Sequence, residues 1–346
     1  MQKITESQFE RVIIYTTITI LFVLLFYLNV FGMLEKKLYD LILVLRHIFN
    51  PQQLEEVVLV TIDDNTIKEF GGWPLSRKYY ARAVERLEKE GVKAIGLDLI
   101  FSKPGPGDIQ LKDTLQKYDN IVLPVVAKLQ MQRGIKNETV KINKIDKPIQ
   151  IFASNAILGH INYLPDRDGI IRNIPLYFKD NGKKYFSFSL RLAEKYLEQK
   201  SLKENINIMD NDKLTISGKD TAEVLLNYPG PAHTLPRITF YELINDQYNK
   251  GFFNNKIVLI GTEVAGLGDK YMTSFSRYGY LSGVEINGQA VYNFINRSYI
   301  TSARTYINLF ILICIMIIHI FVFTHLTPIK SAFIAIISIL FYTGVN

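Results

Sequence analysis

The chain has 346 residues, of which 48% are hydrophobic, and a formal net charge of +7. Its Lys and Arg residues are scattered among Asp and Glu without a basic cluster, which argues against nucleic acid as a partner. The one cysteine, Cys314, excludes an intramolecular disulfide and any metal site built on paired thiolates. Apolar residues are concentrated at the two ends, so we expect membrane segments there and a globular domain between them.

The first apolar segment spans residues 12–33 and contains no charged side chain. About 20 apolar residues cross a hydrocarbon core about 30 Å thick, so this segment predicts a transmembrane helix. A cleaved signal peptide is the alternative, because Lys3 and Arg11 precede the run as an n-region would. Against it, the run exceeds an h-region of roughly 7 to 15 residues, and no small-x-small cleavage site follows.

Two more apolar segments near the C-terminus predict a transmembrane hairpin, with helices over residues 305–325 and 329–346. Lys3, Arg11 and Lys330 would then lie on one side, which the positive-inside rule makes the cytoplasm. The sequence therefore predicts a multi-pass protein of the cytoplasmic membrane, in contact with lipid. Residues 34–304 would form its extracytoplasmic domain.

Leucine and isoleucine recur after the first span at the 4-3-4-3 spacing of a coiled-coil face. The pattern predicts the seam of a homodimer. Packing of the same face onto the chain's own domain is equally open, because fewer than three heptads are present. The residues of this predicted seam are Leu34, Leu38, Leu41, Leu45 and Ile48.

Strand and helix patterns alternate in the first half of the middle region. Strands are predicted over residues 57–62, 92–101 and 121–126, with amphipathic helices over 77–90 and 111–118. This order is typical of βαβ units, whose right-handed crossovers stack helices on a buried parallel sheet.

The second half is less regular. Residues 130–150 alternate polar and β-branched types and predict a polar hairpin or excursion. A hairpin turn with Asp-Gly chemistry is expected at 166–169, between strands over 156–163 and 170–178. Further strands are predicted over 213–216, 224–228 and 256–261, and helices over 187–198 and 284–296. The predicted fold class is α/β: a parallel, doubly wound-like extracytoplasmic domain with an antiparallel insertion, plus transmembrane helices.

Polar side chains follow several predicted parallel strands, where open α/β sheets place their ligand crevices. Carboxylates there could bind a divalent cation or an amine, or could instead cap helices and turns. The single tryptophan, on a Gly-rich loop, could line a pocket or close the edge of the core. The candidate ligand-binding residues are Asp63, Asp64, Trp73, Asp98, Thr262 and Asp269. Metal binding stays open, and no cofactor is predicted.

No catalytic residue is predicted. The glycines of the loop 261–269 lack the spacing of the Rossmann and P-loop motifs, and none of the five histidines lies in H-E-x-x-H. The segment 166–169 begins like a calcium loop but lacks the distal Glu of an EF-hand. A hairpin turn explains it better.

Several segments together resemble one family, the second type of CHASE domain, a sensory module associated with cyclases and histidine kinases. The longest is VVLVTIDDNTIKEFGGWPLSRKYYARAVERLEKEGVKAIGLDLIFSKP; the others are GHINYLPDRDGIIRNIPLYF, FSFSLRLA, LLNYPGP, KIVLIGTEVAGLGDKYMTSFS and GVEINGQAVYNFI. The resemblance implies an N-terminal anchor, an external ligand-sensing domain, and three transmembrane helices feeding a cytoplasmic adenylate cyclase, diguanylate cyclase or kinase. The sequence as given stops within the second of these three helices, without an output domain.

Three functions follow as hypotheses. The first is a receptor that binds a small-molecule or protein ligand and is not itself an enzyme. The second is a membrane-tethered extracytoplasmic enzyme with Asp63, Asp64 and Asp98 as metal ligands. The third is a scaffold for partner proteins in the cell envelope.

Overall fold

The computed structural model describes residues 32–133, 138–180, 182–197, 213–216, 219–264, 266 and 270–300, with residue 17 and single residues between 311 and 334. The chain divides into two units, one of Leu43–Thr301 and the other of Met1–Ile42 with Ser302–Asn346. Nearly all of the three predicted membrane segments lies outside the described residues. Within the described part, no helix is at once long enough and apolar enough to cross a bilayer.

The core of the unit Leu43–Thr301 is a mostly parallel sheet, as the alternating pattern predicts. Six parallel strands lie in the order β12-β1-β13-β2-β3-β5. Their bounds are β12 Arg237–Thr239, β1 Val57–Ile62, β13 Ile257–Thr262, β2 Ala94–Leu97, β3 Ile121–Arg133 and β5 Ile157–His160. Both faces of the central strands β1, β13 and β2 are buried, so these strands are apolar almost throughout rather than alternating.

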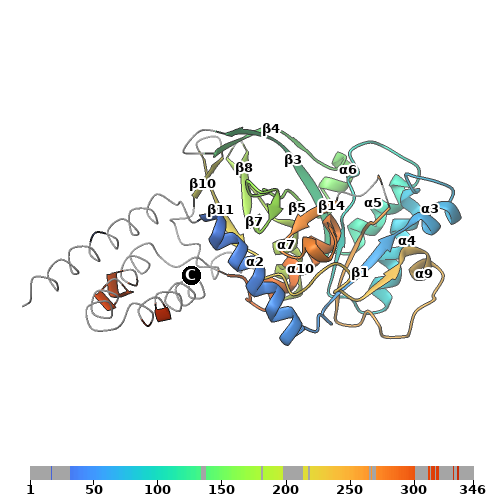
Figure 1. Ribbon diagram of the computed structural model, residues 1–346. Helices are drawn as coiled ribbons and strands as arrows, with labels where there is room; N and C mark the ends of the chain where they lie inside the picture. Colours follow the sequence, from blue (N-terminus) through green and yellow to red (C-terminus); the bar gives the residue numbers. More distant parts are fainter. Residues whose placement is uncertain are drawn as a thin grey trace, which may run out of the picture. The chain divides into compact units, whose positions relative to one another are not determined.

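Helices cover the sheet on both faces (Figure 1). Val58 and Val60 of β1 pack under α4 (Arg77–Lys89), α5 (Asp108–Lys117) and α9 (Phe240–Ile244). Val57 and Leu59 of the same strand pack under α7 (Phe188–Tyr196) and α10 (Gly283–Ile295). The alternation of strand side chains thus builds two apolar cores, one on each side.

Two glycines bring α7 and α10 close to the sheet. A Cβ on Gly96 of β2 would lie 2.7 Å from the Phe188 ring, and one on Gly261 of β13 would lie 2.7 Å from Val284. Because such contacts are far inside van der Waals distance, any larger residue would push the helix away from the strand.

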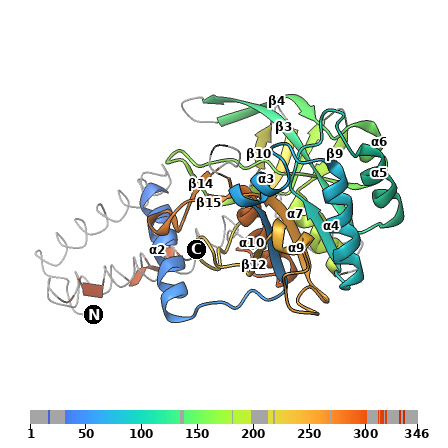
Figure 2. The same cartoon turned by 90° about the vertical axis from the view of Figure 1, so that its right-hand side faces the viewer.

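The insertion is built on β3, which continues beyond the parallel sheet. Its second half pairs antiparallel with β4 (Glu138–Asp146), which confirms the predicted polar hairpin. Figure 2 shows this pair as a long ribbon along the upper edge. The sheet continues through β10 (Lys213–Ile216), β11 (Lys219–Leu225) and β7 (Asn173–Pro175). The remaining strands are β6 (Ile170–Ile171), β8 (Tyr177–Asp180), β9 (Lys183–Phe186), β14 (Lys270–Thr273) and β15 (Leu281–Ser282).

The predicted strand pairing around residues 166–169 is wrong, although the turn is present. Gly169 has a φ of 80°, and its N–H donates to the carbonyl of Asp166 at 2.9 Å. However, β5 pairs with β3, while β6 pairs with β14. Residues 156–163 contribute an edge strand to the parallel sheet, which a local turn signal does not reveal.

The predicted dimer seam lies on α2 (Gly32–Phe49), a continuous helix. Four of its five residues are exposed, with relative exposures of 42–57% for Leu34, Leu41, Leu45 and Ile48. Leu43, outside the seam, is the buried one. The short helices α3 (Asp64–Glu69), α6 (Gln150–Ala153) and η1 (Ser276–Tyr278) complete the described elements.

Candidate functional site

The predicted site residues differ in what they do. Asp63 caps α3: its Oδ1 accepts hydrogen bonds from the N–H of Thr66 at 2.8 Å and from its hydroxyl at 2.5 Å. Asp64 is exposed in the first turn of that helix. The capping interpretation therefore holds for Asp63, and the favourable helix dipole accounts for Asp64.

Asp98 and Thr262 lie at the carboxyl ends of the adjacent strands β2 and β13, where the fold predicts a ligand crevice. Asp98 accepts a hydrogen bond from Asn287 of α10 at 3.0 Å. Trp73 lies on the loop after α3 and is 37% exposed. Asp269 lies outside the described residues.

The described residues do not bring Asp63, Asp64 and Asp98 together as the metal-site hypothesis requires. In the part of the chain that the structure describes, no three His, Cys, Asp or Glu side chains converge on a common point. The physical reason is local: Asp63 turns back onto its own helix, and Asp98 turns toward α10.

A charged cluster that the sequence does not reveal occupies this edge instead. Arg237, at the start of β12, donates to both carboxylate oxygens of Glu263 at 3.0 Å and to Oε1 of Glu285 at 3.0 Å. Ser282, the N-cap of α10, donates to Glu263 at 3.1 Å. Nη1 serves Glu263 and Nη2 serves Glu285, so the rigid guanidinium bridges two carboxylates.

Burial raises the free-energy cost of keeping the side chains of this cluster charged. The side chain of Glu285 is 2% exposed, and that of Arg237 is 21% exposed. Burial raises the pKa of Glu285, and the charge and hydrogen bond of Arg237 partly oppose this effect. Two carboxylates share one guanidinium, so the cluster responds to any added cation or proton.

A cavity of about 120 Å³ lies against the cluster. Its lining includes Thr262, Glu263 and Glu285, with His233 and Lys270 contributing basic side chains. His233 has a φ of 67°, which is uncommon for a residue other than glycine. At about 30 Å³ per water molecule, the cavity has room for a few waters or one small polar group.

A second buried polar network lies at the other end of α10. Asn293 donates from Nδ2 to the carbonyl of Asn227 at 3.1 Å and accepts from its N–H at 2.7 Å. The Asn227 side chain accepts from Arg46 of α2 and donates to the carbonyl of Ser298 at 2.8 Å. Arg46 also donates to the carbonyl of Tyr228 at 2.6 Å.

The loop 227–233 joins the two networks. Its Pro229 carbonyl is 3.1 Å from Nδ1 of His47 on α2, and its Pro231 carbonyl accepts from Gln289 of α10 at 3.4 Å. Its last residue, His233, lines the cavity. A continuous set of contacts therefore connects the cavity with α2 and with the C-terminal end of α10.

The sequence of α10 contains one sign of these two polar networks. Glu285, Gln289 and Asn293 recur every four residues on a mostly apolar helix, and all three are buried. Polar side chains that share one helical face have to find partners when that face is buried. The spacing alone does not say which loop supplies those partners.

Comparison with known families identifies the chain. The model of the CHASE2 domain matches residues 17–322. The chain belongs to the CHASE2 domain family. None of the curated proteins and none of the solved structures with which the chain was compared matches it.

CHASE2 is a sensory extracellular domain family associated with signalling. The match confirms the resemblance drawn from the sequence motifs. Residues 227–231 of the loop and α10 of this CHASE2 domain fall in two of those motifs, LLNYPGP and GVEINGQAVYNFI.

Proposed function

We propose that the chain is a membrane-anchored, extracytoplasmic sensor that transmits ligand binding through α2 and α10. Membership in the CHASE2 family supports the sensory role. The uncharged apolar segment 12–33 and the apolar segments 305–325 and 329–346 support anchoring in the cytoplasmic membrane at both ends of the domain.

The observation that carries the proposal is the shared contact at Asn227. One amide side chain binds Arg46 of α2, and its backbone binds Asn293 of α10. These two helices are the elements of the domain nearest in sequence to the predicted spans. A shift of either helix therefore has to move or break the same hydrogen bonds.

Ligand binding can shift α2 and α10 only if the ligand binds one of two arrangements of these helices more tightly than the other. The cluster of Arg237, Glu263 and Glu285 suits this role, because its charge balance changes with any ion that enters the cavity. In this proposal the cytoplasmic output, a cyclase, diguanylate cyclase or kinase, is provided outside the domain, and the domain itself binds without catalysis.

Hydrogen exchange of the full chain in nanodiscs tests the connection. Arg237→Gln disturbs the cavity end, and we expect faster amide exchange at Asn227 and in residues 43–49, far along the contact path. Leu111→Ala, which removes a buried side chain of α5, is the matched destabilising control. Equally fast exchange of residues 43–49 in both variants would contradict the proposed connection between the cavity and α2.

The proposed sensor is a homodimer whose seam is the exposed face of α2. Cysteine at Leu38 or Leu45, in a Cys314→Ser background, should form disulfide-linked dimers in membranes. Cysteine at Lys37, exposed on the same helix outside the seam, is the control. Equal cross-linking at Lys37 and Leu38, or none at either seam position, would reject the seam.

A further inference from the structure

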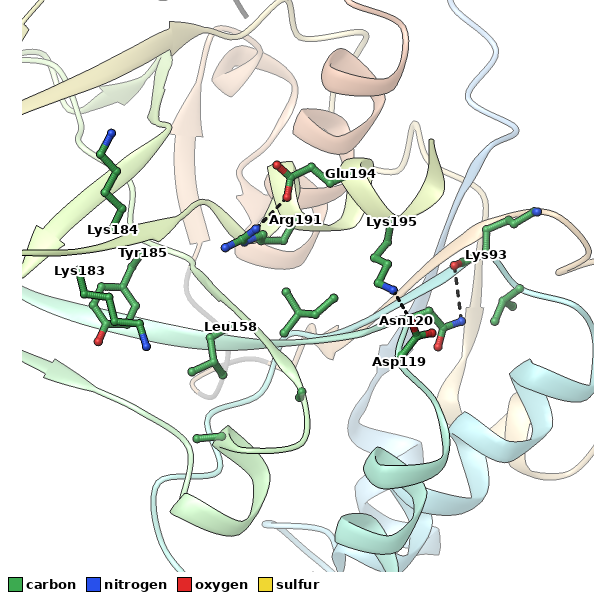
Figure 3. A pocket seen from close by; sticks show the side chains of 14 residues that line it. Lys93, Asp119, Asn120, Leu158, Lys183, Lys184, Tyr185, Arg191, Glu194 and Lys195 are labelled. Carbon is green, nitrogen blue, oxygen red and sulfur yellow. Dashed lines mark hydrogen bonds and ion pairs between the residues drawn. The ribbon is translucent and has the colours of Figure 1, made fainter. Parts of the chain in front are cut away.

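A groove of about 960 Å³ lies at the end of the sheet opposite to the charged cluster, near the amino ends of β2, β3 and β5. Figure 3 shows α7 on one side of it, with Arg191, Glu194 and Lys195, and Leu158 on the other. Its volume falls in the range of about 300–1,000 Å³ that is common for small-molecule sites.

The middle of the groove is apolar. Ala153, Ala156, Ile157 and Leu158 line it. Ile157 and Leu158 belong to β5, which forms one edge of the parallel sheet. A small molecule that covers these side chains would remove apolar surface from water, which favours binding.

The lining carries an excess of positive charge. Lys93, Lys183, Lys184, Arg191 and Lys195 face two carboxylates, those of Asp119 and Glu194, which leaves three positive charges in excess. Two of these cations are already paired: Lys195 with Asp119 at 2.8 Å, and Arg191 with Glu194 at 2.9 Å. The excess charges are those of Lys93, Lys183 and Lys184. Figure 3 shows Lys93 at the end of the groove near Asp119, and Lys183 and Lys184 with Tyr185 at the other end, which therefore carries two of the three.

Aromatic rings hold the cations of this end in place. The Nζ of Lys184 lies 4.4 Å from the ring centre of Tyr177, and the Nζ of Lys183 lies 5.4 Å from that of Tyr185. The guanidinium of Arg191 lies 4.9 Å from the ring centre of Phe186. Cations that are already positioned lose less conformational freedom when an anion binds.

We propose that this groove binds an amphipathic organic anion, with its oxyanion at the end that Lys183 and Lys184 line and its apolar body over Ala156, Ile157 and Leu158. Lysine and arginine are the usual donors to carboxylate and phosphate oxygens.

The groove is connected with the signalling path through α7. The Ser189 hydroxyl of α7 is 3.1 Å from Oδ1 of Asn287, and Asn287 binds Asp98 at the carboxyl end of the sheet. Anion binding itself stands independently of the proposed function; only the use of the anion as a signal rests on it.

Calorimetry of the full chain in nanodiscs of neutral phosphatidylcholine tests binding without any signalling readout. The probes are phenyl phosphate, benzyl alcohol and benzylammonium, which share an aromatic body and differ in charge. We expect binding of phenyl phosphate and no measurable binding of benzylammonium. Lys183→Gln with Lys184→Gln should weaken phenyl phosphate about fivefold, since each exposed ion pair contributes modestly.

Lys68→Gln with Lys89→Gln is the matched control, because both lysines are exposed outside the groove. Absence of phenyl phosphate binding, equal binding of benzylammonium, or an equal loss in the control pair would overturn the proposal. Nanodiscs that contain anionic phosphatidylglycerol identify the source of the anion. Loss of phenyl phosphate binding in them indicates a lipid, and unchanged binding indicates a soluble molecule.

Discussion

Asn293 and Asn227 exchange two hydrogen bonds, so that one buried side chain satisfies both the N–H and the carbonyl of a loop residue. Asn293→Ala should lower the free energy of unfolding by about 2–3 kcal/mol, because two backbone groups lose their partner in a buried place. Chemical denaturation measures this loss.

Asn296→Ala on the same helix is the control for that variant. Asn296 is exposed, and its side chain donates to the carbonyl of Tyr292 one turn earlier. Its substitution should change stability by no more than about 0.5 kcal/mol. Equal losses from both substitutions would contradict the role given to the Asn293–Asn227 pair.

Arg237→Met should destabilise the domain by about 3 kcal/mol at neutral pH, because it leaves Glu285 buried without its counter-charge. The pKa of Glu285 is already raised by burial and should rise further without Arg237. A carboxyl whose pKa is higher in the folded chain than in the unfolded chain lowers the free energy of unfolding as the pH rises from the unfolded pKa through the folded pKa. The loss should therefore shrink on acidification toward pH 4.5.

Glu285→Gln provides the second arm of that experiment. In the Arg237→Met background it removes the uncompensated charge and should recover most of the lost stability at pH 7. Thermal melts at pH 5 and pH 7 measure both effects. A loss that is independent of pH and is not recovered by Glu285→Gln would show that packing, and not charge, dominates.

Arg172 gives a prediction about the turn 166–169. Its side chain is 1% exposed and binds Asp166 at 2.5 Å and Asp168 at 2.8 Å. Arg172→Met should cost about 3–5 kcal/mol, since both carboxylates lose a buried partner. Arg167→Met, exposed in the same turn, should cost much less. Calcium should not raise the melting temperature of the unaltered chain, and a clear rise would contradict this assignment.

The burial of His160 predicts that the domain loses stability in acid. Burial lowers the pKa of its imidazole to about 3, and its ring packs 4.4 Å from that of Phe178. The unfolded chain takes up this proton near pH 6.5 while the folded chain does not, so stability falls as pH drops from about 6.5 toward 3.

The size of this effect follows from the same linkage. Between pH 7 and pH 5 the contribution of His160 is about 2 kcal/mol. His160→Leu removes it, so the variant should lose that much less stability than the unaltered chain over this range. Denaturation at both pH values measures the difference, and parallel losses in the two proteins would disprove it.

The central sheet is predictable from the sequence because its information is local. The run Val57–Ile62 is β-branched and apolar, and it is followed by a helical pattern, so βαβ order can be read directly. The length of β3 is not predictable in this way. Its second half, beyond Val126, is extended only because β4 pairs with it.

The candidate site is less predictable, because its partners come from distant parts of the chain. Asp63 looks like a ligand residue in the sequence and is a helix cap in the structure. Glu263 and Glu285 give no sign that Arg237 joins them, since that pairing depends on β12 lying beside β1. Strand order, which local patterns do not encode, therefore decides the site.

Thiol labelling tests the central claim, that this domain is held outside the cytoplasm by membrane segments. Cys314→Ser gives a cysteine-free chain. In that background, cysteine at exposed Lys68 should react with a membrane-impermeant maleimide in intact spheroplasts. Cysteine at Lys3 should react only after permeabilisation. Labelling of Lys68→Cys only after permeabilisation would contradict the account.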